Sequence, residues 1–451
     1  MASLLAALMF AAIGLLLPLG FPVGFTVLGV AIGFAALGQL FGVFNVHLLS
    51  ALPLRVLNLM NNDLLQAVPL FIYMGAVMER TKMSRDLFTS LGALFGPRPA
   101  GLAIATLLLG LLLAPATGAI GATVVALGLL ALPPMLEARY DRPFALGVTA
   151  AVGTLGTVLP PSLILILLGD QMRIAQSDAQ RLLVQAPAAP LLLSKLYVGM
   201  VLPVVLVITG YATILLWRAL RSPESCPGRP SAISARRAAI SIVPPFAIIA
   251  TTLVLIVSGK LYTVEAAAAA AVAMTLWALV RREMSLRTLA EIVRLVTRVA
   301  GAIFLLIMGA NTFSLVFRGF AGDVLVREAI TGSFSSPTLA VPVVFGLLLV
   351  FGFFLDALEI IFLVVPIAIP PLIVLGGDPL WLAVLVGVTL QTSFLLPPSG
   401  FALFFARSVA PKDVSMTTIY RGVRPFVLLQ IAVLLAVLLL PGLATWLPGR
   451  A

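Results

Sequence analysis

Residues 153–162 read Gly-Thr-Leu-Gly-Thr-Val-Leu-Pro-Pro-Ser, and residues 391–400 read Gln-Thr-Ser-Phe-Leu-Leu-Pro-Pro-Ser-Gly. Both stretches lie inside long apolar runs, begin with small or polar residues and contain Pro-Pro-Ser. A proline removes a backbone donor and clashes with the preceding turn, so a helix cannot continue through either stretch unbroken. We therefore predict two broken helices that face one substrate and ion site.

The composition indicates a membrane protein. Hydrophobic residues make up 61% of the 451-residue chain and charged residues only 10%, whereas charged residues form about a quarter of ordinary globular domains. The prediction is an all-α polytopic membrane protein embedded in the lipid bilayer. The net charge of +11 comes from basic residues scattered in loops, which indicates membrane topology and no nucleic-acid partner. Residues 4–19 are interpreted as a retained first span and not as a signal peptide.

Ten continuous apolar runs are candidate spans: 4–19, 23–41, 64–78, 144–168, 195–217, 241–258, 262–280, 300–317, 380–406 and 425–447. Two further runs, 100–134 and 339–375, are interrupted at 114–121 and 351–359. Each half of these is too short for the crossing of about 20 residues that a bilayer requires. We expect re-entrant helical hairpins that enter and leave on one side. Residues 45–62 and 284–298 are expected to be amphipathic helices in the interface plane.

An internal repeat organises these segments. Pro-Pro pairs recur at 133–134, 160–161, 370–371 and 397–398, which gives two halves offset by 237 residues. Each half holds five crossings and one hairpin, and the odd number makes the two halves inverted repeats. The predicted domains are a first repeat over 1–218 (hairpin 100–134, broken helix 144–168), a flexible cytoplasmic linker over 219–240, and a second repeat over 241–451 (hairpin 339–375, broken helix 380–406).

The distribution of basic residues supports this topology. With both termini outside, twenty of the 28 basic residues lie on the inside, as the positive-inside rule requires. The eight on the outside are Arg55, Arg173, Arg181, Lys195, Lys260, Arg318, Arg327 and Arg450.

The breaks and hairpin tips carry the candidate chemistry. Unsatisfied carbonyls and hydroxyls within a bilayer are tolerated where they line a cavity, and they suit a bare monovalent cation. The ends of half-helices suit an anionic substrate. Asp356 is a carboxylate in apolar surroundings, which favours an ion-site or gate role, although a helix cap is the alternative. The candidate substrate and ion-binding residues are Thr117, Gly118, Gly121, Gly153, Thr154, Gly156, Thr157, Pro160, Pro161, Ser162, Gly352, Asp356, Gln391, Thr392, Ser393, Pro397, Pro398, Ser399 and Gly400.

No catalytic motif is visible. The sequence has no phosphate-binding loop, no HExxH and no acidic cluster for magnesium, so ATP hydrolysis and metalloenzyme chemistry have no residues to support them. We predict no catalytic residues and no covalent cofactor. Asp141 and Asp170 are interpreted as loop residues at span ends. A stand-alone ion and organic-anion symporter and a membrane-embedded enzyme remain as alternatives to a transporter subunit.

The chain resembles the large membrane subunit (M or DctM type) of tripartite ATP-independent periplasmic (TRAP) transporters. The resemblance covers residues 4–447 and rests on Gly153-Thr154-Leu155-Gly156, Gly169-Asp170-Gln171, residues 352–359, and residues 390–404 with Tyr420-Arg421-Gly422. It implies an elevator transporter driven by sodium, with a separate small membrane subunit and a periplasmic binding protein as partners, in a bacterial inner membrane. The pattern looks like the branch for 2-oxo acids, lactate and related organic acids, with C4-dicarboxylates as a further class.

The resemblance also implies two sodium sites. One would pair residues 117–121 with 153–157, and the other would pair 352–356 with 391–393. The candidate sodium ligands are Thr117, Gly153, Thr157, Asp356 and Thr392. Two departures concern substrate size or one ion site: the first hairpin tip reads Ala-Pro-Ala-Thr where many members are serine-rich, and Ser399 stands where a bulkier residue is expected.

Overall fold

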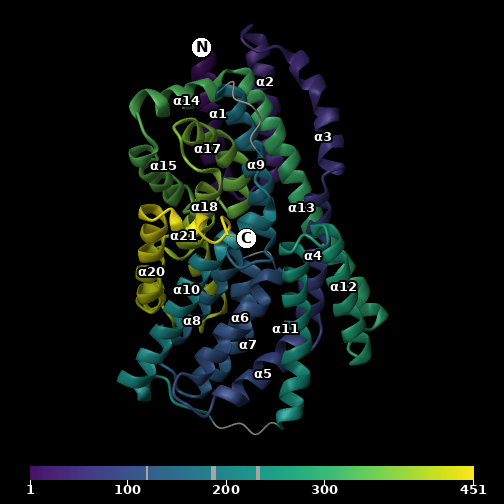
Figure 1. The fold of residues 1–451 in the computed structure, drawn as a ribbon, viewed down its shortest axis with the longest axis vertical. Coiled ribbons are helices and arrows are strands. Elements are labelled where there is room, and N and C mark those ends of the chain that lie inside the picture. The colour runs from purple at the N-terminus through teal and green to yellow at the C-terminus, as the bar shows by residue number, and fades with distance from the viewer. Residues whose placement is uncertain (118–119, 184–188, 230–233, 451) are drawn as a thin grey trace. The chain divides into compact units, whose positions relative to one another are not determined.

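The structure is a computed structural model that describes residues 1–450 except 118–119, 184–188 and 230–233. All regular elements in these ranges are helices (Figure 1). The α-helices are α1 Ala2–Leu16, α2 Val23–Leu40, α3 Leu52–Met60, α4 Asp63–Arg80, α5 Met83–Phe95, α6 Gly101–Thr117, α7 Ile120–Glu137, α8 Arg142–Gly153, α9 Leu163–Leu183, α10 Leu193–Arg221, α11 Ala235–Val257, α12 Thr263–Val280, α13 Leu286–Gly319, α14 Gly322–Ser333, α15 Pro337–Phe351, α16 Ala357–Glu359, α17 Val365–Val374, α18 Pro379–Leu395, α19 Phe401–Val409, α20 Met416–Leu439 and α21 Gly442–Thr445. Five short helical turns complete them: η1 Leu17–Leu19, η2 Val46–Ala51, η3 Thr154–Thr157, η4 Pro223–Ser225 and η5 Ile360–Val364.

Within the described ranges, eight helices are long and apolar enough to cross a bilayer. They include α2, α7, α10, α12 and α20. The predicted all-α polytopic membrane class is therefore confirmed. The inverted orientation of the two halves and the position of the bilayer stay predictions.

The chain forms two compact units. Unit 1 comprises residues 1–66, 167–193 and 297–383, and unit 2 comprises 67–166, 194–296 and 384–451. Each unit takes segments from both predicted repeats, because helices distant in sequence pack on each other. The units are therefore not the two repeats, and the division into repeats stays a prediction.

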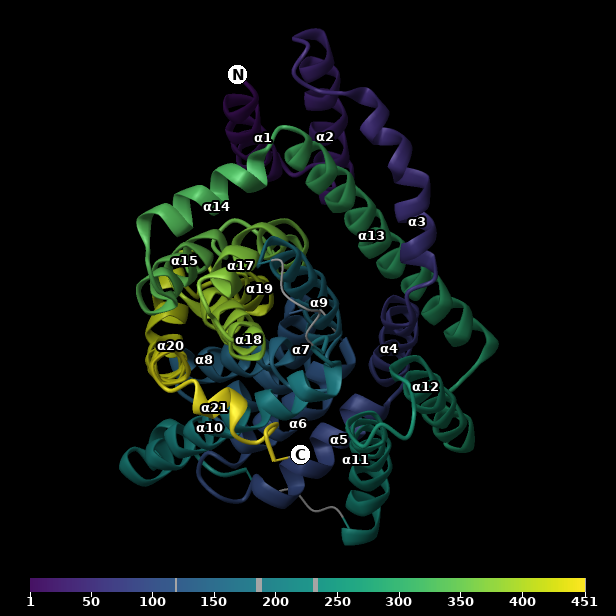
Figure 2. The ribbon, with the colours of Figure 1, turned by 45° about the horizontal axis from the view of Figure 1, so that its top comes forward.

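Unit 1 is built around α13. Phe10 of α1 makes edge-to-face contacts with Phe313 and Phe317 of α13, with ring centroids 5.2 and 5.1 Å apart, a geometry that aromatic quadrupoles favour. A Cβ added at Gly309 would lie 2.8 Å from the carbonyl oxygen of Gly24, so α2 and α13 meet backbone to backbone. Helix α14 packs on α1 and on α17 (Figure 2).

Unit 2 has α8 and α20 at its centre. A Cβ added at Gly147 of α8 would lie 2.1 Å from the carbonyl oxygen of Gly422 in α20, so this contact requires glycine. The two helices of the first hairpin, α6 and α7, pack on each other and on α8, and α19 packs on α7 and α8. Unit 2 therefore contains the first hairpin and both Pro-Pro-Ser stretches.

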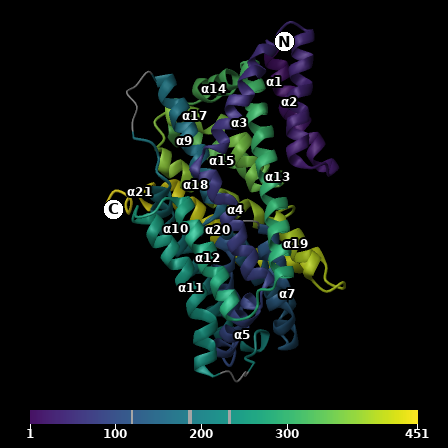
Figure 3. The ribbon, with the colours of Figure 1, turned by 90° about the vertical axis from the view of Figure 1, so that its right-hand side faces the viewer.

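Several boundaries differ from expectation. Residues 284–298 do not form a separate interfacial helix, because α13 runs unbroken over 34 residues (Figure 3); no proline interrupts Leu286–Ala300. Residues 45–62 do form η2 and the exposed helix α3. Helices α5 and α14 occupy stretches without a predicted span, since both are short and amphipathic.

Part of the linker 219–240 is hydrogen-bonded to the segment that precedes α6, and the predicted flexibility of the linker stays a prediction. The Ala100 amide donates to the Cys226 carbonyl at 2.8 Å, and the Arg229 amide donates to the Gly96 carbonyl at 2.6 Å. Arg229 also pairs with Glu137 at 2.8 Å. Residues 223–229 are therefore anchored to unit 2 by backbone and ionic contacts that are invisible in the sequence.

Candidate functional site

The first break is a compact polar turn. Helix α8 ends at Gly153, η3 follows, and the chain turns through the cis Pro160–Pro161 bond before α9 begins. The hydroxyl of Thr154 donates to the Ala151 carbonyl at 2.8 Å, and that of Thr157 donates to the Thr154 carbonyl at 2.9 Å. Both side chains are fully buried. The hydroxyls are thus satisfied locally, and their oxygens retain lone pairs for another ligand.

Ser162 closes the turn. Its hydroxyl donates to the Gly156 carbonyl and accepts from the Ile164 amide at 3.2 Å. Ser162 therefore caps the start of α9, in the manner of a helix N-terminal serine.

A buried amide supports the first break from α20. The Gln430 Nε2 group donates to Thr154 Oγ1 at 3.1 Å and to the Tyr211 hydroxyl at 2.7 Å. The Tyr211 hydroxyl in turn donates to the Ala151 carbonyl at 3.4 Å. Gln430 Oε1 has no partner among the described residues. Neither Tyr211 nor Gln430 is a candidate from the sequence, since each lies in an apolar run away from both breaks and both hairpin tips.

The first hairpin packs on this break. Helices α6 and α7 both contact η3, and a Cβ at Gly153 would lie 2.2 Å from Cγ2 of Val124 in α7. Gly121 of α7 is equally close-packed, since its Cβ would lie 2.4 Å from the Phe405 ring of α19. Gly118 lies outside the described residues, and Thr117 ends α6. The pairing of the hairpin tip with 153–157 thus stays a prediction.

The second break is shorter than predicted. Helix α18 continues to Leu395, so Gln391, Thr392 and Ser393 are helical and not unwound. Pro397 disturbs only the helical turn directly before it. The residues earlier than this turn, including Gln391, can therefore remain helical. Thr392 donates to the Val388 carbonyl at 2.8 Å, and Ser393 donates to the Leu390 carbonyl at 2.9 Å.

The turn after α18 runs from Leu396 to Gly400. The Pro397–Pro398 peptide bond is cis, like its counterpart in the first break. Ser399 is partly exposed, whereas Ser162 is fully buried. Gly400 lies against the chain behind it, since its Cβ would be 2.4 Å from the Phe394 carbonyl oxygen.

Gln391 is the most unusual polar side chain of unit 2. It is fully buried, and neither Oε1 nor Nε2 has a hydrogen-bond partner among the described residues. The buried Thr389 hydroxyl two residues earlier is also unpartnered. A buried polar group without a partner costs about 1–3 kcal/mol. These atoms are therefore the strongest sign of a ligand site in this unit.

The tip of the second hairpin is a helix cap. Gly352 follows α15, and Asp356 accepts from the Ala357 amide at 2.7 Å, while Glu359 Oε2 accepts from the Asp356 amide at 3.2 Å. This capping box is the alternative that the sequence left open for Asp356. A π-helical turn, η5, follows Glu359, and such turns are frequent at functional sites. The predicted pairing of this tip with Gln391–Ser393 involves the other compact unit and stays a prediction.

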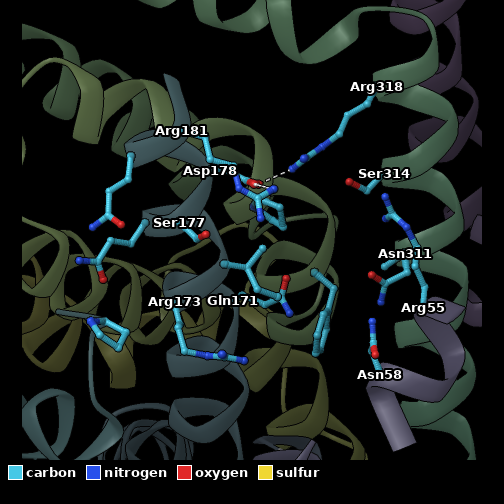
Figure 4. Close-up of a pocket in the computed structure, with 17 residues that line it drawn as sticks. Arg55, Asn58, Gln171, Arg173, Ser177, Asp178, Arg181, Asn311, Ser314 and Arg318 are labelled. Carbon is cyan, nitrogen blue, oxygen red and sulfur yellow. Dashed lines mark hydrogen bonds and ion pairs between the residues drawn. The ribbon is translucent and has the colours of Figure 1, made fainter. Parts of the chain in front are cut away.

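Unit 1 contains a polar pocket of about 630 Å³ lined by α3, α9, α13 and the second hairpin (Figure 4). Four arginines line it, namely Arg55, Arg173, Arg181 and Arg318. The sequence relates these arginines only to membrane topology. It predicts a loop position for Asp170, but Asp170 is buried inside α9, where its carboxylate accepts a hydrogen bond from Asn62 at 2.9 Å. The helical spacing of residues 170, 173, 177 and 181 was the signal that α9 extends past the apolar run.

Comparisons with known proteins identify the chain. Residues 9–443 match the family described as tripartite ATP-independent periplasmic transporter, DctM component. The chain is 28% identical to the sialic acid TRAP transporter large permease protein SiaM of Vibrio cholerae, covering 95% of both chains. It is 26% identical to the C4-dicarboxylate TRAP transporter large permease protein DctM of Pseudomonas aeruginosa, covering 90% of this chain and 91% of the other.

Two further similarities bear on substrate range and fold. The ectoine/5-hydroxyectoine large permease protein UehC of Ruegeria pomeroyi is 26% identical over 99% of both chains. The crystal structure of the YdaH transporter of Alcanivorax borkumensis superimposes with a TM-score of 0.63 at 13% identity, covering 96% of this chain and 98% of that chain; it shows the fold alone. The relatives' substrates differ, so the predicted organic-acid branch stays a prediction. The chain is a multi-pass membrane transporter protein and not an enzyme, and it belongs to the DctM family of TRAP transporter large permease subunits.

Proposed function

We propose that this chain is the large permease subunit of a sodium-driven tripartite importer of an organic acid. It would work with a small membrane subunit and a periplasmic binding protein, in a bacterial inner membrane with both termini periplasmic. The substrate class is a small carboxylate: a 2-oxo acid, a lactate-like acid or a C4-dicarboxylate. Family membership supports the tripartite arrangement.

The observation that carries the proposal is the buried Gln391 carboxamide. It lies six residues before Pro397 of the Pro397–Pro398 break, and both of its polar atoms lack partners among the described residues. A carboxamide offers a hard oxygen to sodium and an N–H donor to a carboxylate. Retaining such a group in an apolar helix is unfavourable unless a ligand completes it.

The first break would supply a second set of oxygens. Thr154 and Thr157 donate to backbone carbonyls, so their oxygens keep acceptor capacity, part of which Gln430 uses at Thr154. The family resemblance assigns sodium ligation to Thr117, Gly153, Thr157, Asp356 and Thr392. An elevator movement would carry substrate and ions across together.

Uptake in proteoliposomes tests the proposal. The chain is reconstituted with its small membrane subunit, and uptake of a radiolabelled carboxylate panel is measured with the binding protein and an inward sodium gradient. We expect uptake that needs both. Uptake by this chain alone, without binding protein, would favour a stand-alone symporter instead, and uptake without a sodium gradient would refute sodium coupling.

Asp356 can be tested separately by two variants. Asp356→Ala removes both the charge and the cap, whereas Asp356→Asn keeps the cap, since asparagine caps helices as well as aspartate. We expect both variants to remain folded and to lose sodium-coupled uptake. If Asp356→Asn shows wild-type uptake with unchanged sodium dependence, Asp356 acts only as a helix cap and not as an ion-site or gate residue.

A further inference from the structure

The arginine pocket of unit 1 carries more positive charge than its acidic residues neutralise. Arg318 pairs with Asp178 at 2.6 Å, and the same carboxylate lies 4.0 Å from Arg181. Asp178 is therefore shared by two guanidinium groups. Arg173 pairs with Asp170 at 3.1 Å. The four arginines that line the cavity are thus accompanied by two carboxylates, of which Asp178 lines it.

Of the four arginines that line the pocket, Arg55 is the one without an ion-pair partner among the described residues. It is half-buried on α3, outside the eight membrane spans. Burial, and then repulsion from Arg318, lowers the pKa of Arg55, while Asp178 acts in the opposite direction. Figure 4 shows Arg55 and Arg318 on the same side of the pocket as Asn311 and Ser314, with Asp178 opposite Arg318.

The neutral lining adds hydrogen-bond donors. Gln171 is buried beside Asp170, with its Nε2 3.2 Å from the carboxylate, and Asn58 and Asn311 also line the cavity. A guanidinium group binds a carboxylate through two parallel N–H donors, and amide donors complete the remaining oxygens. The volume of about 630 Å³ is within the range of small-molecule sites.

We propose that this pocket binds the carboxylate of the incoming organic anion, with Arg55 as its principal ligand. The inference rests on the proposed function and adds a site that lies away from both Pro-Pro breaks. All four arginines fall on the outside in the topology predicted from loop charges. The pocket would therefore capture the anion on the periplasmic side, where positive charge raises the local concentration of an acidic substrate.

Arginine modification tests the site without relying on transport. The chain, purified with its small subunit in phosphatidylcholine nanodiscs, is treated with phenylglyoxal, and modified arginines are quantified by peptide mass spectrometry. The probes are succinate and pyruvate, with succinamide as the neutral control. We expect both acids to slow modification of Arg55 by roughly tenfold, since a bidentate ion pair shields the guanidinium, while Arg287, whose side chain is 91% exposed, reacts unchanged.

Variants sharpen the result. The readout is protection of Arg318 from phenylglyoxal. Arg55→Gln should raise the succinate concentration that gives half-protection by roughly tenfold or more. Arg55→Lys should give an intermediate value, because lysine keeps the positive charge but lacks the paired N–H donors of a guanidinium group. The matched control Arg287→Gln should have no effect. Equal protection in Arg55→Gln and wild type would overturn the assignment, and so would protection by succinamide.

Three further outcomes distinguish the pocket proposal, a lipid headgroup site and the proposed function. Phosphatidylglycerol nanodiscs that protect Arg55 without added acid, with no further effect of succinate, would identify a lipid headgroup site and overturn the proposal. Normal sodium-driven uptake together with unprotected Arg55 would overturn the pocket and leave the proposed function standing. Protection without any uptake would support the pocket and count against the proposed function.

Discussion

The two Pro-Pro-Ser turns share a cis peptide bond and a 237-residue offset, but they satisfy their polar groups in different ways. In the first, the Thr154 hydroxyl has partners on both sides, one of them Gln430. In the second, Gln391 is buried without a partner among the described residues. The difference shows that a repeated sequence motif can have its polar side chains hydrogen-bonded within the protein at one copy and leave a buried polar side chain without a partner at the other.

The burial of the serine in each Pro-Pro-Ser turn shows the same difference between the two breaks. Ser162 is fully buried and bonded on both sides, whereas Ser399 is partly exposed. The first break is thus enclosed by α6, α7 and α20, and its Thr154, Thr157 and Ser162 hydroxyls all donate to carbonyls of the protein. We expect substitutions of the residues that support the first break, Ser162 and Gln430, to affect mainly folding, and substitution of Gln391 before the second break to affect mainly transport.

The largest effect is expected for Gln391→Leu. Leucine removes two unpartnered buried polar atoms, so the melting temperature should stay constant or rise. If the carboxamide contacts substrate or sodium, uptake should fall by roughly a hundredfold, which corresponds to about 2–3 kcal/mol for a lost charged-group hydrogen bond. Uptake in proteoliposomes and thermal unfolding in detergent check this. Unchanged uptake would show that the Gln391 carboxamide contacts neither substrate nor sodium.

Gln430→Leu should show the opposite pattern. It removes the donors to Thr154 and Tyr211, so we expect a loss of about 1–3 kcal/mol in unfolding free energy. Residual uptake per folded molecule should be closer to wild type than in Gln391→Leu. A Gln430→Leu protein with unaltered thermal stability and no uptake would reverse the roles of the two amides.

Gly153→Ala probes the packing of the first break. Its Cβ would lie 2.2 Å from Val124, and overpacking of this kind costs about 1–3 kcal/mol. Gly301→Ala is the matched control, since no atom lies within 4 Å of its Cβ, and alanine in an open helical position is favourable by about 0.5–1 kcal/mol. Thermal unfolding should therefore move in opposite directions for the two variants; a shift of the same sign would contradict the close contact.

Alanine substitutions of the two equivalent serines, Ser162 and Ser399, should differ in stability by a smaller amount. Ser162→Ala loses a capping hydroxyl, for which we expect about 1 kcal/mol of destabilisation. Ser399→Ala removes a partly exposed hydroxyl and should change stability by less than about 0.5 kcal/mol. Equal melting temperatures for the two variants would argue that the turns are equivalent after all.

The smallest effect concerns the ion pair between Arg142, which begins α8, and Asp413, which follows α19. The side-chain hydrogen bond from Arg142 holds the pKa of Asp413 below its ordinary value. A lowered folded-state pKa gives stability that is present above the unfolded-state pKa of about 4 and is lost as the pH falls through the folded-state pKa. Both side chains are exposed, so Asp413→Asn should lower the melting temperature only slightly at pH 7, and by less in high salt. A large, salt-independent change would contradict this.

The sequence predicted the class of fold because hydrophobic composition alone separates membrane from soluble helices. It also located both breaks, since proline acts on its own turn wherever it stands. It failed where helices are amphipathic: α5, α14 and the second half of α9 carry charges at helical spacing, and an apolar-run criterion reads them as loops. The same limitation divided α13 at residues 298–300.

Four of the candidate site residues, Thr154, Thr157, Ser162 and Gln391, are buried polar residues. Gln391 lies in α18 and not in a break, and the binding role of all four stays a prediction. The contributions of Gln430 and Tyr211 could not be foreseen, because each comes from a helix far along the chain. The arginine pocket escaped notice for the same reason, since its four guanidinium groups belong to α3, α9 and α13.

By itself, the sequence determined that this protein is helical, crosses a membrane and breaks two of its helices at Pro-Pro-Ser, because these properties depend on composition and on local backbone chemistry. Only the tertiary structure decided how each break is completed. The partners of a buried amide or guanidinium lie on other helices, and their distances follow from packing rather than from spacing along the chain. For this reason two stretches that share Pro-Pro-Ser differ in the structure. Gln430 donates a hydrogen bond to the first, whereas Gln391 before the second is left available to a ligand.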